Sequence, residues 1–157
     1  MDLILWRHAE AVESGEAAGD LERPLTSRGE RQAARMAAWL NQHLPATTRV
    51  LASPARRTQQ TARALERKFR TLPALAPDAS VAAVLEAARW PDAKEPVLVI
   101  GHQPTLGLVA AQLLSGAAQP WAVKKGAVWW LRSREREREG EGQVVLVNVI
   151  SPDQLRT

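Results

Sequence analysis

At 157 residues, with 45% hydrophobic and 24% charged residues, the chain has the size and composition of one ordinary globular domain, placed here at residues 1–157. It contains no cysteine, which excludes disulfides, thiolate metal ligands and a thiol nucleophile. The net charge of +4 favours anionic partners, but the basic residues are scattered and not interleaved with aromatics, so nucleic acid is not an expected partner.

Three short apolar runs are predicted to form buried parallel strands. They cover residues 3–6, 49–52 and 97–100, and each is rich in leucine, isoleucine, valine or alanine. The first run is too short for the core of a signal peptide and far too short to span a bilayer. A cytoplasmic location without membrane association is therefore the default expectation.

Segments of helical period separate these runs. A capping box of Ser27 and Glu30 predicts the start of the first helix, and Pro45 closes it. Ser53 and Pro54 predict the start of the second helix, with a side-chain cap followed by proline at the first helical position. Its apolar face would continue to Phe69. Two further helices are expected at residues 80–89 and 105–115, the last one ending at Gly116.

The C-terminal part has a different pattern. Residues 127–131 and 144–150 read as two antiparallel strands, and Trp129 and Trp130 must then face opposite sides of the sheet. The loop at residues 132–141 alternates arginine and glutamate, and its charges cancel, which is typical of a solvated hairpin tip. The whole pattern predicts an α/β three-layer sandwich: a mostly parallel central sheet, helices on both faces and an antiparallel edge near the C-terminus.

Polar residues follow each of the three predicted parallel strands. Arg7 and His8 follow the first, Ser53 to Arg57 follow the second, and His102 follows the third. Ligands of open α/β sheets bind outside the carboxyl ends of the strands. If these strands are neighbours, two histidines and at least two arginines gather at one edge of the sheet.

The types of residue limit the chemistry at this edge. Arginine is permanently charged and presents a rigid fork that matches phosphate oxygens. Histidine is suited to act as a nucleophile or as a proton-transfer group near neutral pH. Because this group of cations would repel a divalent ion, it makes a poor metal site but a good cradle for a dianionic phosphoryl group. The third histidine, His43, lies near a helix end and is expected to be exposed and structural.

With these motifs the sequence resembles the histidine phosphatase superfamily, and within it the short phosphohistidine phosphatases of the SixA type. The matching motifs are Leu5-Trp6-Arg7-His8-Ala9-Glu10, Arg23-Pro24-Leu25-Thr26-Ser27-Arg28-Gly29, Ser53-Pro54 followed by Arg57 and Gln60-Thr61-Ala62, and Val99-Ile100-Gly101-His102-Gln103-Pro104. In order and spacing they cover most of the first 110 residues. The spacing Ser-Pro-x-x-Arg selects Arg57, and not its neighbour Arg56, as the family arginine.

The resemblance implies a role for each matched position. His8 would attack phosphorus and form a transient phosphohistidine, while Arg7, Arg57 and His102 would hold the phosphoryl oxygens. Water would then release phosphate. Arg23 would border the pocket or form a structural ion pair. No metal or organic cofactor is implied.

The sequence departs from the family in two places. Ala9 stands where the family often has glycine, and it leaves little bulk near the phosphate. Larger relatives supply an acidic residue that protonates the leaving oxygen, and here Asp78 and Glu86 are only weak candidates, since Glu86 falls on the expected surface of a helix.

The lack of a clear acidic residue to protonate the leaving oxygen indicates which substrate to expect. An alkoxide leaving group needs a proton from a positioned acid, whereas the imidazole of a phosphohistidine leaves more easily. We therefore expect a monomeric phosphatase that acts on phosphohistidine in a protein partner. One alternative is a phosphatase of small phosphorylated molecules. Another is a catalytically silent module that binds phosphoproteins.

Overall fold

The computed structural model describes residues 1–15, 18–134 and 142–155. Within these residues, six strands form one sheet in the order β3-β2-β4-β1-β5-β6. Their bounds are β1 (Asp2–Arg7), β2 (Arg49–Ala52), β3 (Arg70–Thr71), β4 (Val97–Gly101), β5 (Val128–Arg134) and β6 (Gln143–Ile150). Strands β1 to β4 run parallel to one another, whereas β5 pairs antiparallel with both β1 and β6. The predicted mostly parallel sheet with an antiparallel C-terminal edge is thus confirmed.

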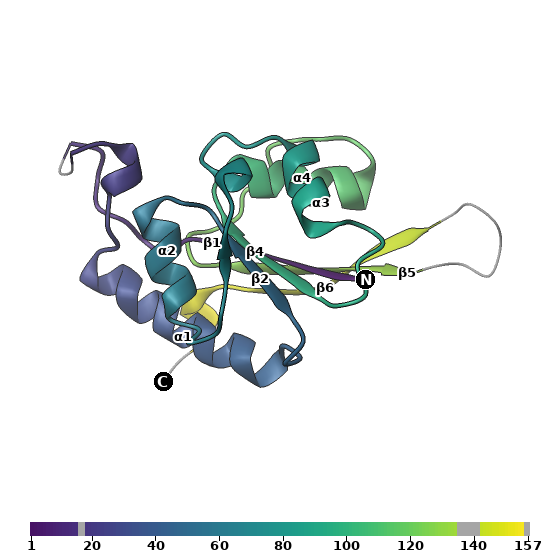
Figure 1. Ribbon diagram of the computed structural model, residues 1–157, viewed down its shortest axis with the longest axis horizontal. Helices are drawn as coiled ribbons and strands as arrows, with labels where there is room; N and C mark the ends of the chain where they lie inside the picture. Colours follow the sequence, from purple (N-terminus) through teal and green to yellow (C-terminus); the bar gives the residue numbers. More distant parts are fainter. Residues whose placement is uncertain (16–17, 135–141, 156–157) are drawn as a thin grey trace.

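Helices cover both faces of this sheet. They are α1 (Ser27–His43), α2 (Arg56–Arg63), α3 (Val81–Ala88) and α4 (Thr105–Ser115), with short 3-10 turns η1 (Asp20–Glu22), η2 (Pro73–Leu75) and η3 (Pro152–Gln154). Figure 1 shows α1 and α2 on one side of the sheet and α3 and α4 on the other. This arrangement is the three-layer sandwich that the sequence predicts. None of the helices in the described ranges has the length and apolar character needed to cross a membrane.

Alternation along the strands divides the core into two layers. In β1, Leu3 and Leu5 pack with residues of α3 and α4, while Ile4 and Trp6 pack with residues of α1 and α2. All four side chains are fully buried, and full burial of a side chain of this size stabilises the fold by about 1.5–3 kcal/mol. In β5, Trp129 packs on the first layer and Trp130 on the second, as the strand period requires.

The N-terminus of α1 lies where the sequence predicts it, but the predicted cap is wrong. Thr26, not Ser27, caps the helix, and its Oγ1 accepts the amide hydrogen of Gly29 at 3.0 Å. Thr26 has the extended backbone that a cap requires, whereas Ser27 is already helical. The Thr26 hydroxyl also donates to the Glu10 carboxylate at 2.8 Å, which ties the helix to the loop after β1.

Helix α2 is shorter than predicted at both ends. It begins at Arg56, its N-cap Ala55 provides no side-chain cap, and Ser53 lies outside it. The helix ends at Arg63, and Glu66 adopts a left-handed conformation at φ 54°, so Phe69 is not on its face. The hydroxyl of Ser53 is occupied elsewhere, because it lies 2.7 Å from Nε2 of His102.

The later elements follow the prediction closely. Ser80 caps α3 by accepting the amide hydrogen of Ala83, and α4 ends at Gly116 in the left-handed conformation. Strand β3 was not predicted, because it is only two residues long and both are exposed and polar. The predicted hairpin tip at residues 132–141 is wrong at its start, because β5 continues to Arg134, and residues 135–141 lie outside the described residues.

Candidate active site

The three predicted parallel strands are direct neighbours in the sheet. β4 lies between β1 and β2, with Leu5 and Leu51 both paired to Val99. The carboxyl ends of these strands surround a cavity of about 160 Å³. It is lined by Arg7, His8, Ala11, Glu13, Arg23, Arg57, Pro77, His102, Gln103 and Lys125. All five residues singled out from the sequence as catalytic or substrate-binding therefore line one cavity.

His8 is buried at the end of β1 and held in one orientation. Its Nδ1 lies 2.7 Å from the carbonyl oxygen of Ala9. Because a carbonyl can only accept, Nδ1 carries the ring proton and Nε2 keeps its lone pair. Burial lowers the pKa of His8 to about 3, and the neighbouring His102, Arg57 and Arg7 oppose protonation further. At neutral pH the ring is therefore uncharged and chemically able to act as a nucleophile.

The two arginines are anchored by their terminal nitrogens. Nη1 of Arg7 donates to the carbonyl oxygen of Val123 at 2.9 Å. Nη1 of Arg57 donates to the carbonyl oxygen of Asp20 at 2.8 Å, and its Nη2 donates to the Asp20 carboxylate at 3.2 Å. Burial lowers the pKa of both guanidiniums from the ordinary arginine value, so each benefits from a nearby negative charge.

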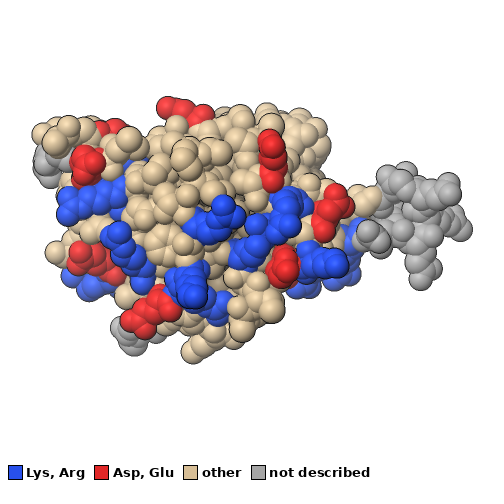
Figure 2. Space-filling model, in the orientation of Figure 1, with Lys and Arg blue, Asp and Glu red and all other residues tan. Residues whose placement is uncertain are grey.

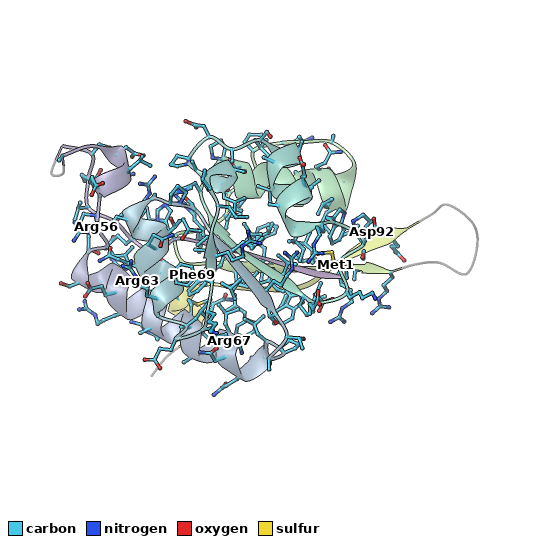
Figure 3. All side chains as sticks on the ribbon, viewed as in Figure 1. Met1, Arg56, Arg63, Arg67, Phe69 and Asp92 are labelled. Atoms are coloured by element: carbon cyan, nitrogen blue, oxygen red, sulfur yellow. The ribbon has the colours of Figure 1, made fainter. Side chains whose placement is uncertain are left out.

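Only the second arginine of the pair at the start of α2 belongs to the site. Arg57 is 3% exposed and lines the cavity. Arg56, which is labelled in Figure 3, is exposed and is not among the lining residues. The choice of Arg57 by the spacing from Ser53 and Pro54 agrees with this placement.

His102 follows β4 and faces His8, with 5.4 Å between the ring centroids. Its Nε2 lies 2.7 Å from Oγ of Ser53, and that oxygen also accepts the amide hydrogen of Ala55 at 3.2 Å. With one acceptor position filled in this way, the arrangement favours donation from the Ser53 hydroxyl to Nε2, which leaves the ring proton on Nδ1. Burial and the nearby Arg57 lower the pKa of His102 to about 4.

Several of the residues around the cavity have a buried nitrogen without a hydrogen-bond partner. In the described part of the chain, four buried side-chain nitrogens lack a hydrogen-bond partner, and three of them belong to residues that line this cavity: Arg7 Nε, Arg57 Nε and His102 Nδ1. Each buried polar group without a partner costs about 1–3 kcal/mol, so such groups are normally paired. Three N–H donors beside the free Nε2 of His8 match the oxygens of a phosphoryl group.

Arg23 has both of the roles considered from the sequence. It lines the cavity, and it also donates to the Asp20 carboxylate at 3.0 Å and to the Val12 carbonyl at 2.8 Å. Slight burial alone would raise the pKa of Asp20, but Arg57 and Arg23 together hold this pKa below its ordinary value. Sequence reasoning missed Asp20, whose one signal is its position three residues before Arg23.

The weak acid candidates are not in the site. Asp78 and Glu86 are exposed and line no part of the cavity, although Pro77 does. Among the described lining residues the one carboxylic acid is Glu13, which is exposed. Sequence reasoning missed Glu13 and Lys125, since each lies in a loop without a recognisable motif. The same part of the chain contains no cluster of three or more histidine, aspartate or glutamate side chains that could hold a metal.

Ala9 fits its position beside His8. Its side chain is fully buried against Leu25 and Ala33, and its amide donates to Oγ1 of Thr61 at 3.2 Å. An alanine methyl group is therefore accommodated in this packing.

Comparison with known proteins assigns the chain to a family. The model of the histidine phosphatase superfamily (branch 1) matches residues 3–79. The phosphohistidine phosphatase SixA of Escherichia coli is 33% identical over 128 residues, which cover 76% of this chain and 78% of that protein. An uncharacterized protein of Picosynechococcus is 34% identical, over 85% of this chain and 86% of its own.

A solved structure gives the same result. The protein histidine phosphatase SixA complexed with tungstate superposes with a TM-score of 0.79 at 28% identity, covering 99% of this chain and 100% of that one. The chain thus belongs to the histidine phosphatase superfamily, in its short SixA-type branch, and is a phosphatase.

Proposed function

We propose that this phosphatase removes the phosphoryl group from phosphohistidine in a protein, with His8 as the nucleophile. The observation that carries the proposal is the free Nε2 of His8, in a small cavity also lined by Arg7, Arg57 and His102, each of which has a nitrogen without a hydrogen-bond partner. The fixed tautomer and the low pKa of about 3 keep that nitrogen unprotonated at neutral pH.

The reaction has two steps. The lone pair of His8 Nε2 forms a bond to phosphorus while the bond from phosphorus to the substrate imidazole breaks. The substrate ring leaves as a neutral imidazole when its other nitrogen carries a proton. The His8 ring, now phosphorylated on Nε2 and still protonated on Nδ1, gains positive charge that the Ala9 carbonyl stabilises at 2.7 Å. A water molecule then attacks phosphorus, which releases phosphate and restores neutral His8.

The remaining polar side chains stabilise the charge that develops on the phosphoryl oxygens. Nε of Arg7, Nε of Arg57 and Nδ1 of His102 are the donors available for this task. They are fixed before the reaction, since each group is anchored through another nitrogen. Loss of one such preorganised donor lowers kcat by about 10²–10³ in comparable sites. Arg23 would add charge at the border of the cavity and hold Asp20 away from the phosphoryl group.

The size of the cavity favours a side chain presented from outside. Pockets that enclose small molecules usually measure about 300–1,000 Å³. The cavity at His8 measures about 160 Å³, enough for a phosphoryl group but small for a whole sugar phosphate. The one carboxylic acid among the described lining residues, Glu13, is exposed, which also favours an imidazole leaving group over an alkoxide.

Release of phosphate from two substrates tests this proposal. A histidine-phosphorylated protein and a sugar phosphate are each incubated with the wild type, His8→Ala and Glu13→Gln. We expect fast release from phosphohistidine alone, no release with His8→Ala, and release close to the wild-type rate with Glu13→Gln.

Three other outcomes would reject parts of the proposal. Equal or faster release from the sugar phosphate would favour a small-molecule phosphatase. Loss of phosphohistidine activity in Glu13→Gln would make Glu13 the missing acid. No release from either substrate by the folded wild type would favour the phosphoprotein-binding module.

A further inference from the structure

A second basic cavity lies at the opposite end of β2 from the active site. It measures about 590 Å³, and its lining residues include the five cations Arg49, Arg67, Lys68, Arg70 and Arg89 together with Phe69. No described residue that lines it is acidic. Arg49 begins β2, while the other end of that strand leads to Ser53 in the active site. Figure 2 shows Lys and Arg side chains gathered on the face in front of β2.

Arg49 has the same feature that marks the catalytic arginines. Its Nε is the fourth buried side-chain nitrogen without a hydrogen-bond partner in the described ranges, and the other three line the active site. Its Nη2 donates to the carbonyl oxygen of Ala88 at 3.1 Å, which fixes the guanidinium in place. Burial is the largest cause that lowers the pKa of Arg49. Repulsion from Arg89 and Arg70 lowers this pKa further, whereas Glu95 raises it. A bound anion would relieve this repulsion.

Arg89 occupies a backbone position that arginine does not favour. It is the C-cap of α3 in the left-handed conformation, at φ 55° and ψ 40°. Glycine is the usual residue in this conformation at a helix end, because a Cβ is disfavoured there. The chain nevertheless places an arginine there, and that arginine lines the cavity. Unfavourable backbone of this kind is concentrated at functional sites.

The other cations differ in their availability. Arg67 is occupied, since its Nε donates to Oδ1 of Asn41 at 2.7 Å and its Nη1 to the Pro45 carbonyl at 2.9 Å. Lys68, Arg70 and Arg89 are exposed. Their side chains make no hydrogen bond or ion pair with any described residue. Phe69 is half-buried and adds an aromatic ring to the wall (Figure 3).

We propose that this cavity binds a small polyphosphate anion, either inorganic polyphosphate or the phosphate chain of a nucleotide. The anchored guanidinium of Arg49 and the side chains of Arg70, Arg89 and Lys68 supply positive charge and donors for several phosphate oxygens. The cavity lies within the size range of pockets that enclose small molecules. The proposal concerns a site separate from His8 and does not depend on the proposed substrate.

A nuclear magnetic resonance titration tests the site directly. Backbone amide shifts of the full chain are followed with tripolyphosphate and, separately, with ATP at constant ionic strength. We expect shifts at residues 49, 70 and 89 that saturate independently of those at residues 8, 57 and 102. In the double variant Arg70→Gln/Arg89→Gln the first set should weaken by about tenfold or more, because charge-assisted hydrogen bonds are lost. Phosphatase activity should persist, since neither residue lines the active site.

Matched variants distinguish binding at this cavity from a general effect of the positive charge of the protein. Arg31→Gln/Arg63→Gln removes the same charge from exposed positions of α1 and α2 and should leave tripolyphosphate binding within about twofold of the wild type. Arg89→Gly should weaken binding without lowering the Tm, because glycine suits the left-handed C-cap.

The two ligands distinguish the sources of the phosphate chain. Tighter binding of ATP, with shifts at Phe69, would indicate a nucleotide, and equal affinity would indicate inorganic polyphosphate. Shifts confined to the active site would overturn the proposal, as would equal losses in the two double variants. A short DNA duplex that binds at residues 49, 70 and 89 more tightly than tripolyphosphate would overturn it in favour of nucleic acid.

Discussion

At the scale of single residues, the active site depends on the protonation state of His8. Burial lowers the pKa of His8 to about 3, even though the hydrogen bond from Nδ1 to the Ala9 carbonyl opposes this effect. The ring should therefore stay neutral throughout the range from pH 5 to pH 8. Magnetic resonance of the ring carbons and nitrogens as a function of pH measures this directly. A midpoint near the ordinary histidine value of 6.5 would contradict the burial argument.

Arg57 gives a second test at the same scale. Arg57→Lys keeps the charge but removes the Nε donor and the fork that holds the Asp20 carbonyl and carboxylate. We expect kcat to fall by about 10²–10³. The neighbouring change Arg56→Lys provides the control, since Arg56 is exposed and lies outside the cavity. Similar losses in both variants would show that the basic start of α2, and not the position of Arg57, is what matters.

At the scale of elements, the N-terminus of α1 holds the loop that follows His8. The hydroxyl of Thr26 accepts the Gly29 amide hydrogen and donates to the carboxylate of Glu10, which lies two residues after His8. Thr26→Ala should lower the free energy of unfolding by about 1 kcal/mol, as loss of an N-cap usually does. Ser27→Ala should change it by less than about 0.5 kcal/mol, because Ser27 is exposed. Urea denaturation of both variants measures the difference, and a larger loss in Ser27→Ala would restore the capping box predicted from the sequence.

Elements with a local signal in the sequence could be predicted, and features that depend on distant contacts could not. The strands with runs of apolar residues and the order of the helices were predictable, because period and burial are local properties of the chain. The start of α2 was not predictable, because Ser53 forms a hydrogen bond with His102, a residue 49 positions away in sequence. Asp20, Glu13 and Lys125 were missed for a related reason. Segments without a periodic pattern or a recognised motif bring them to the site, so the sequence does not indicate that they lie there.

At the scale of the whole molecule, two buried neutral histidines link stability to pH. The folded pKa values of His8 and His102, about 3 and about 4, lie below the value of 6.5 expected for the unfolded chain. Between pH 6.5 and pH 4 the unfolded state therefore binds more protons, and stability falls as the pH falls. The loss is at most about 1.4 kcal/mol per pH unit for each ring.

Urea unfolding at pH 7, 6 and 5 tests this linkage. The slope of stability against pH should be shallower in His8→Gln/His102→Gln, whatever its absolute stability, because glutamine does not titrate. An equally steep slope in the double variant would place the acid sensitivity in other groups.

The central claim is that His8 receives the phosphoryl group, and a single-turnover quench experiment tests it most directly. The enzyme in excess is mixed with a histidine-phosphorylated protein, stopped with base after milliseconds, and analysed by peptide mass spectrometry. We expect one phosphoryl group on His8 that forms and decays at rates consistent with kcat, with none formed in His8→Ala. A phosphoryl group on any other residue, or full turnover by His8→Ala, would contradict it.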